Sequence, residues 1–163
     1  GLGTVLAEAC GGVELREEPG APGYGRARRI SNGRGLRVVS VVFGPMATKE
    51  ALANEGLREA VNKAAAPHIE KLAKEPSVEG VRRASRAFSD SLGLYTEAMR
   101  AALRALDERL PGAFSMNMFG EALFAILGEG EVAEALSAAS SLRRLGARVF
   151  VSAVDGGGAR VVG

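Results

Sequence analysis

The chain has 163 residues, of which 47% are hydrophobic and 25% are charged, so it is long enough for one domain with a hydrophobic core. Its formal net charge of +2 is too small to indicate a polyanionic partner, and no stretch approaches the ~18 uninterrupted apolar residues of a membrane span. A single cysteine, Cys10, and a single histidine, His68, exclude an intramolecular disulfide and a Cys/His zinc site. We therefore expect a cytoplasmic protein with no membrane partner and no metal ligands in this chain.

The first third of the chain predicts a short helix followed by two strands. Residues 2–9 have a helical pattern that the pair Gly11-Gly12 ends, because glycine readily adopts the positive φ angles found at helix ends. Residues 13–16 alternate apolar and polar side chains, as a strand does. Residues 26–30 form a second candidate strand after a loop that is rich in Gly and Pro.

A cluster of arginines lies in and after this predicted hairpin, around the turn-forming residues Ser31-Asn32-Gly33. No aromatic side chains are interleaved with these arginines to stack on nucleic acid bases. We therefore interpret the cluster as a solvated face of the hairpin, and we do not expect binding to nucleic acids. Its members are Arg26, Arg28, Arg29, Arg34 and Arg37.

The middle of the chain begins with a strand and continues with helices. Residues 36–43 are rich in β-branched side chains, which is typical of a buried central strand. From Thr48 to Leu110 the apolar residues recur with a helical period, which predicts several helices. Thr48 is a candidate N-cap of the first helix, and Pro67 suits the first turn of another, where a missing backbone N–H is tolerated.

Two further helices are predicted from apolar stripes along one face. Ser77 is a candidate N-cap of a helix that Gly93 ends, and its expected buried side chains are Val78, Val81, Ser85, Phe88 and Leu92. The second helix is expected to end at Pro111-Gly112 and to bury Met99, Leu103, Leu106 and Leu110.

The final third alternates strands with a helix and completes the predicted fold. The expected elements are a buried strand over 122–127, a helix over 131–145 closed by Gly146, and strands over 149–154 and 159–162. Asp155 and Arg160 flank a run of three glycines and are expected to stabilise that turn. This order predicts a single α+β domain over residues 1–163, with a mostly antiparallel sheet, helices packed on one side and a ferredoxin-like topology.

No general phosphate-binding motif is present, since both Gly-x4-Gly-Lys-Ser/Thr and Gly-x-Gly-x-x-Gly after a strand are absent. Four other segments carry a resemblance to a known family. They are Gly1-Leu2-Gly3-Thr4-Val5-Leu6-Ala7-Glu8 with Gly11-Gly12, Arg16 and Pro19-Gly20-Ala21-Pro22-Gly23; Phe43-Gly44-Pro45 with Thr48-Lys49; Ser115-Met116-Asn117-Met118-Phe119-Gly120; and Gly158-Ala159-Arg160. In this order they closely resemble segments of the archaeal pantoate kinases of the GHMP superfamily.

The resemblance implies the fold of a GHMP kinase C-terminal domain, with residues 1–35 as the helix and hairpin that end the preceding domain. It implies ATP-dependent phosphorylation of pantoate, on the route to coenzyme A, with Mg²⁺ brought by ATP. In this superfamily the Pro-x3-Gly-Leu-Gly-Ser-Ser loop that holds the triphosphate lies in the N-terminal half, and this sequence has no counterpart of it. We therefore expect the chain to be the C-terminal, substrate-side half of such a kinase and to be inactive alone.

The resemblance also indicates site residues, each of which has a plain structural alternative. Thr4 stands where the family generally carries an Asp that orients or deprotonates the acceptor hydroxyl, and Thr cannot act as that base. Arg16 is a candidate clamp for the pantoate carboxylate, or a charge on the surface of a strand. Thr48 and Lys49 are candidates for contacts to phosphate or substrate, although helix capping alone would explain Thr48. The remaining candidates are expected to shape the substrate pocket, with core packing as the alternative for the methionine: Ser115, Met116, Asn117 and Gly120.

Two other interpretations stay open. The first is another small-molecule kinase of the superfamily, of the shikimate or mevalonate type. The second is a non-catalytic ligand-binding or assembly domain with a kinase-like scaffold, which Thr4 and the missing loop would permit. A homodimer is compatible with each of these interpretations.

Overall fold

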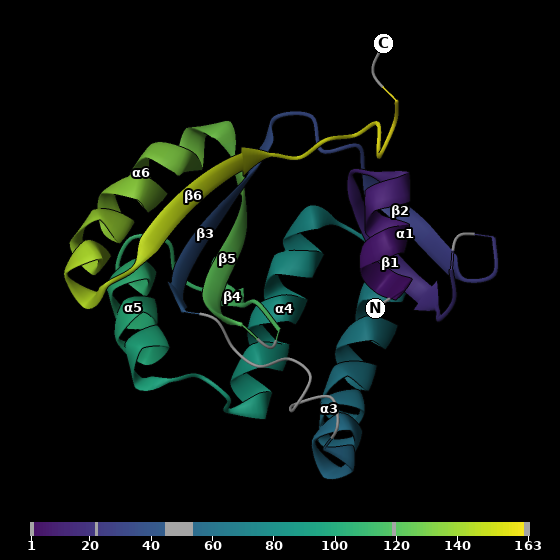
Figure 1. The fold of residues 1–163 in the computed structure, drawn as a ribbon, viewed down its shortest axis with the longest axis horizontal. Helices are drawn as coiled ribbons and strands as arrows, with labels where there is room; N and C mark the ends of the chain where they lie inside the picture. The colour runs from purple at the N-terminus through teal and green to yellow at the C-terminus, as the bar shows by residue number, and fades with distance from the viewer. Residues whose placement is uncertain (1, 22, 45–53, 119, 162–163) are drawn as a thin grey trace.

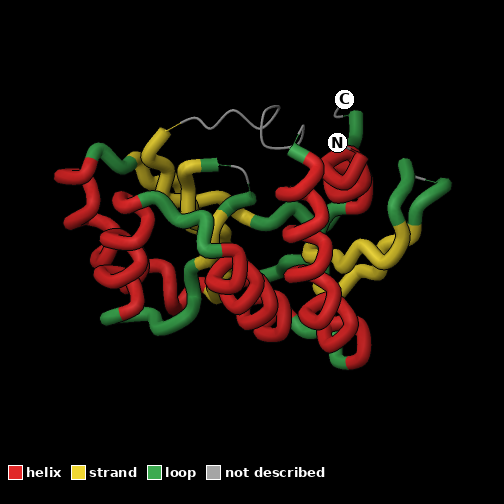
Figure 2. The backbone as a smooth tube through the Cα atoms, turned by 90° about the horizontal axis from the view of Figure 1, so that it is seen from below, coloured by secondary structure: helices red, strands yellow, loops and turns green. Residues whose placement is uncertain are grey.

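The computed structural model describes residues 2–21, 23–44, 54–118 and 120–161, which form helices and two antiparallel sheets (Figure 1). The elements in chain order are α1 (Leu2–Cys10), β1 (Val13–Glu18), β2 (Arg26–Ser31), β3 (Leu36–Gly44), α3 (Glu55–Lys74), α4 (Val78–Leu92), α5 (Glu97–Asp107), β4 (Ser115–Met116), β5 (Glu121–Gly128), α6 (Glu129–Ser140), a short 3₁₀ helix (Ser141–Leu145) and β6 (Arg148–Ala153). Figure 2 shows the hairpin β1–β2 and the larger sheet on opposite sides of the helices α3 and α4.

The larger sheet has the strand order β4-β5-β3-β6, and its neighbouring strands are all antiparallel. Helices connect β3 to β4, and α6 connects β5 to β6, so each connection skips one intervening strand. This is the interleaved βαββαβ arrangement of ferredoxin-like folds. The predicted antiparallel α+β fold is therefore confirmed, and the strand expected over 36–43 is an inner strand of the sheet.

The main core lies between one face of this sheet and the helices α5 and α6. Side chains on a strand alternate between its two faces, and Val39 and Val41 of β3 are fully buried, whereas the intervening Ser40 is only half-buried. The register places Val39 opposite Ala125 of β5, and Val41 opposite Leu123. The predicted apolar stripe belongs to this core: Met99, Leu103 and Leu106 come from α5, and Leu110 follows the end of that helix.

Helix α4 begins and ends where the sequence predicts. The Ser77 side chain accepts a hydrogen bond of 3.0 Å from the backbone N–H of Gly80, and Gly93 adopts the left-handed conformation with φ 64°. The predicted buried stripe is wrong, because its members are half-buried, and the side chain that α4 buries most is Ser89, which is 2% exposed. The reason is that Val81, Ser85 and Phe88 line a groove between α4 and α3, while Ser89 binds the backbone of β4.

Pro67 lies inside α3, so the prediction that it begins a helix is wrong. Proline removes one backbone hydrogen bond from a helix interior, but in this helix of 20 residues the turns on both sides continue. The described part of α3 begins at the N-cap Asn54, whose side chain accepts a hydrogen bond of 3.0 Å from the N–H of Leu57. The predicted cap Thr48 lies outside the described residues.

The C-terminal segment differs from its prediction. Residues 159–161 are not a strand, because their chain packs against the first helix: the N–H of Ala159 donates to the carbonyl of Glu8 at 2.6 Å. The predicted role of Asp155 and Arg160 is confirmed, because the Asp155 carboxylate accepts hydrogen bonds from Gly157 N–H at 2.7 Å and from Arg160.

The helix α5, which was predicted to reach Pro111, ends earlier, at Asp107.

Candidate functional site

Two of the predicted site segments leave the larger sheet at the same end of its strands, where β3 ends and β5 begins. Strands β4 and β5 are joined by a tight turn, in which Gly120 N–H donates to the Asn117 carbonyl at 3.0 Å and Asn117 N–H donates to the Ala122 carbonyl at 2.9 Å. The last residue of β3, Gly44, pairs with Glu121 at the start of β5. The segment that carries Thr48 and Lys49 follows Gly44, and these two residues lie outside the described part of the chain.

The β4–β5 turn exposes little of the predicted polar set. Ser115 is 2% exposed and Met116 is 5% exposed, and Met116 packs in the main core on the same sheet face as Leu123. Asn117 is exposed, so it is the side chain of this group that a substrate could reach. A Cβ atom on Gly120 would lie 3.5 Å from the Asn117 carbonyl oxygen, its nearest described neighbour, so packing alone does not require glycine there.

Arg16 lies in the other sheet, at the middle of β1 and opposite Ala27 of β2. Its side chain is half-buried, and among the described residues its Nε atom is buried without a hydrogen-bond partner. The Nε atoms of Arg28 and Arg82 are buried and unpartnered in the same way, so this feature does not single out Arg16 as a ligand-binding residue. The structure does not bring Arg16 into the sheet that carries Ser115.

Thr4 lies in α1, the helix that was predicted from the first residues. This helix ends with a hydrogen bond of 2.9 Å from Gly11 N–H to the Ala7 carbonyl, and Leu6 anchors it with a side chain that is 4% exposed. The helix is confirmed, and the role of Thr4 stays a prediction.

Three arginines of the predicted cluster form ion pairs with acidic neighbours. Arg26 contacts Glu17 at 3.2 Å and Glu18 at 2.9 Å, and Arg28 contacts Glu17 at 3.1 Å. Farther along, Arg37 contacts Glu129 at 2.6 Å. These ion pairs fit a solvated face and reduce the positive charge that the cluster offers to a polyanion.

A charged network behind the β4–β5 turn was not predicted from the sequence. Arg86 of α4 donates to both oxygens of Asp107, at 2.9 and 2.8 Å, and to both oxygens of Asp90, at 3.0 Å each. The Tyr95 hydroxyl donates to Asp90 at 3.0 Å. Burial and the neighbouring Asp90 raise the pKa of Tyr95 to about 12, and the hydrogen bonds to Asp107 raise the pKa of Arg86. The i, i+4 spacing of Arg86 and Asp90 was the one local signal in the sequence.

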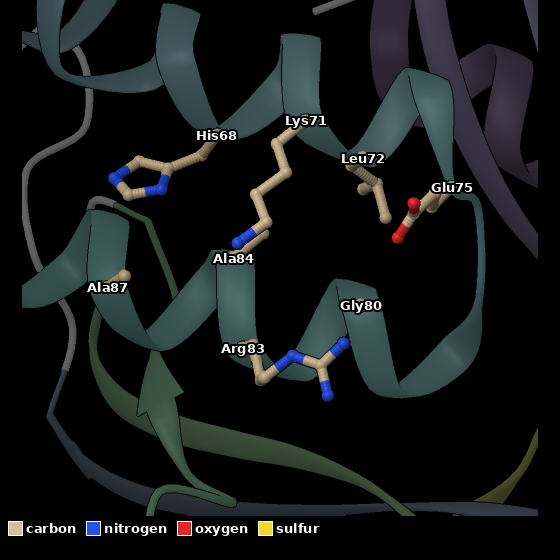
Figure 3. A pocket seen from close by; sticks show the side chains of 8 residues that line it. All are labelled: His68, Lys71, Leu72, Glu75, Gly80, Arg83, Ala84 and Ala87. Atoms are coloured by element: carbon tan, nitrogen blue, oxygen red, sulfur yellow. The ribbon is translucent and has the colours of Figure 1, made fainter.

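A surface groove runs between α3 and α4, with a volume of about 230 Å³ (Figure 3). Charged side chains of both signs line it, with Lys71 and Glu75 on α3 and Arg83 on α4. His68 also lines the groove and is half-buried in the interior of α3, rather than at a helix start as predicted. None of the predicted site residues that the structure describes lines this groove.

Among the described residues, no group of three or more His, Cys, Asp and Glu side chains is arranged to hold a metal ion. Within the same ranges, no helix is long and apolar enough to cross a membrane.

No protein-family model matches the chain, but a comparison with curated proteins finds two similar enzymes. The pantoate kinase of Thermococcus kodakarensis is 32% identical over 135 residues, and that of Methanocaldococcus jannaschii is 27% identical over 137 residues. These matches cover 83% and 84% of this chain but 44% and 49% of the two relatives.

A solved structure gives the same result. A phosphotransferase related to the coenzyme A biosynthesis pathway superposes with a TM-score of 0.73 and 26% sequence identity. The match covers 92% of this chain and 48% of that protein. This chain therefore spans about half the length of the curated relatives that it matches, and along most of its own length it is similar to the archaeal pantoate kinases.

Proposed function

We propose that this chain is the C-terminal, substrate-side part of a GHMP-type kinase that transfers the γ-phosphoryl group of ATP to the hydroxyl of pantoate. The observation that carries the proposal is the match to two archaeal pantoate kinases over more than four fifths of the chain, at 83% and 84%. The similarity to a phosphotransferase of the coenzyme A pathway supports it independently, because that comparison rests on the fold.

The site of this proposal is the end of the larger sheet at which β3 ends and the β4–β5 turn lies. The exposed Asn117 can donate and accept hydrogen bonds with the hydroxyl groups of pantoate, and the Gly120 N–H closes the turn by donating to the Asn117 carbonyl. Thr48 and Lys49 are proposed to contact substrate or phosphate from the segment that follows Gly44. Phosphoryl transfer depends on positioning and on charge stabilisation, which such a set of polar groups can provide.

Arg16 is proposed to bind the pantoate carboxylate. A guanidinium group forms two parallel hydrogen bonds with a carboxylate, and the Nε of Arg16 has no partner among the described residues. Arg16 and the β4–β5 turn lie in different sheets on opposite sides of α3 and α4, so Arg16 is assigned from the resemblance and not from a pocket that the described residues form. Replacing Arg16 with Met is then expected to raise the KM for pantoate more than the KM for ATP.

The described residues do not supply a complete binding site for ATP and Mg²⁺. The three consecutive glycines do not form a phosphate cradle, since Gly157 N–H already donates to Asp155 and a Cβ on Gly158 would lie 2.3 Å from the Ala9 carbonyl oxygen. The 163 residues also lack the family's triphosphate loop. We therefore propose that the main ATP site is formed by residues outside this chain, and that the chain alone has no kinase activity.

Thr4 supports one alternative. A threonine cannot serve as the general base that an Asp would provide, so a diverged, non-catalytic domain that binds a ligand or a partner is the second candidate. We favour the kinase, because phosphoryl transfer needs only modest help from a base.

The test is ATP-dependent phosphorylation of pantoate by the protein expressed from its complete coding region, with mevalonate and shikimate as competing acceptors. Turnover of pantoate alone would support the proposal. Turnover of mevalonate or shikimate in its place would assign another kinase of the superfamily, and no turnover of any of the three would favour the non-catalytic alternative.

A further inference from the structure

Strand β4 is an edge strand of the larger sheet, and its outer edge faces α4 rather than solvent (Figure 1). Backbone groups of successive residues in a strand point alternately to its two sides. The N–H of Asn117 points toward β5, because it donates to the Ala122 carbonyl. The backbone groups of Phe114 and Met116 therefore point outward, where an edge strand usually leaves them to water.

Two side chains of α4 bind these outward groups. Arg86 donates to the Phe114 carbonyl at 3.2 Å, and the Ser89 hydroxyl accepts from the Met116 N–H at 3.2 Å. The same hydroxyl donates to the Ser85 carbonyl at 2.8 Å, so its donor and acceptor capacities are both used. The backbone on either side of Ser115 is thus fixed to one helix.

The remaining bonds of Arg86 fix its own position. Its guanidinium is held between Asp90 on α4 and Asp107 at the end of α5, and Asp107 also accepts from Gly112 N–H at 3.1 Å. Besides these carboxylates, Arg86 binds the carbonyl of Phe114, the residue that precedes β4. The network therefore joins two helices to the start of β4.

We propose that Arg86 and Ser89 are positioning residues that hold the β4–β5 turn in the conformation that binds substrate. This inference rests on the proposed function, because it assigns the substrate to the turn formed by Asn117 and Gly120. Neither side chain needs to touch the substrate. Ser89 is 2% exposed and acts through the backbone of Met116, and Arg86 acts through the backbone of Phe114.

The experiment compares Ser89→Ala with Ser91→Ala in the protein expressed from its complete coding region. Both changes remove a hydroxyl from α4 that donates to a backbone carbonyl of the same helix, but Ser91 is exposed and donates only to Phe88, at 2.7 Å. Ser89→Ala leaves the Met116 N–H without its partner, which should raise the KM for pantoate about tenfold and change the KM for ATP less than about twofold. Ser91→Ala should leave both constants unchanged.

A second pair of variants covers the case in which Ser89→Ala does not fold. Arg86→Lys keeps the charge but loses the fork that binds Asp107 and the Phe114 carbonyl together. Its control is Arg83→Lys on the same helix, whose side chain is 69% exposed and forms an ion pair with Glu79 at 3.7 Å. The expected result is again a raised KM for pantoate in the Arg86 variant alone.

Amide hydrogen exchange gives a readout that does not depend on activity. In Ser89→Ala or Arg86→Lys, residues 116–118 and 120 should exchange about tenfold faster, while residues 122–127 of β5 keep their protection. Unchanged exchange and an unchanged KM for pantoate would overturn the inference even if the wild type phosphorylates pantoate. If the wild type does not turn over pantoate, the proposed function and the substrate role of the turn both fail, and the exchange data still decide whether α4 positions the turn.

Discussion

The ion pair between Arg86 and Asp107 gives a stability prediction that can be worked from the structure. Its two hydrogen bonds are 2.9 and 2.8 Å long, and the side chains of Arg86 and Asp107 are 21% and 29% exposed. Buried hydrogen bonds to charged groups contribute about 1.5–3 kcal/mol, whereas exposed ion pairs contribute about 0–1 kcal/mol. Partial burial and bidentate geometry therefore predict a coupling free energy of about 1.5–2.5 kcal/mol.

A double-mutant cycle measures this coupling free energy. Urea unfolding followed by circular dichroism gives the free energy of unfolding for the wild type, for Arg86→Ala, for Asp107→Ala and for the double variant. The cycle is needed because each single change also removes other bonds, such as those from Arg86 to Asp90 and from Gly112 to Asp107.

The matched control is the pair Arg83 and Glu79, on the same helix, whose side chains are 69% and 56% exposed and lie 3.7 Å apart. Its cycle should give a coupling of less than about 0.5 kcal/mol. A coupling for Arg86 and Asp107 that is no larger than the control would refute the reasoning, because burial and geometry would then add nothing to the pair.

Three further predictions concern the core, a helix end and a buried hydroxyl. Leu106→Ala removes a side chain with 0% exposure from the main core and should lower the free energy of unfolding by about 3 kcal/mol in the same urea assay. Gly93→Ala should destabilise by about 1 kcal/mol because of φ 64°, whereas Gly130→Ala in α6 should be neutral or stabilising; both sites have open space, so equal effects would exclude the backbone explanation. In a Tyr24→Phe background, the tyrosinate absorbance of Tyr95 should titrate with a pKa of about 12, and a midpoint near 10 would contradict its burial against Asp90. Because this folded-state pKa lies above the ordinary value, the stability that Tyr95 contributes should be present below pH 10 and be lost as the pH rises toward 12, and Tyr95→Phe should reduce that loss.

The elements of the larger sheet could be predicted because their sequence patterns are local. The β-branched run of β3 and the apolar run of β5 identify buried strands directly, and the glycines that end α1 and α4 adopt the positive φ angles that their positions require. Pro67 was misleading, because a proline at a helix start and one inside a long helix look alike in the sequence.

The features that were missed depend on tertiary contacts. The apolar stripe of α4 predicted its face toward α3 but not the burial of Ser89, which follows from hydrogen bonding to an edge strand. Residues 159–161 have strand-like composition, yet their chain binds the end of α1.

The candidate site was located only in part by its sequence pattern. The β4–β5 turn was predicted as a pocket segment, but the sequence did not show that Ser115 and Met116 are both buried and that Asn117 is exposed, because the burial of Ser115 and Met116 depends on packing against the rest of the fold. The network around Arg86 joins residues from 86 to 114, and no spacing rule along the chain connects them.

Phosphorus NMR of ATP mixed with pantoate tests the central claim most directly. With the protein expressed from its complete coding region, a new phosphate-monoester resonance should appear together with ADP, while the 163-residue chain alone should give neither. Absence of the monoester with the complete protein would contradict the assignment as a pantoate kinase, and its formation by the 163-residue chain alone would contradict the proposal that the main ATP site lies outside this chain.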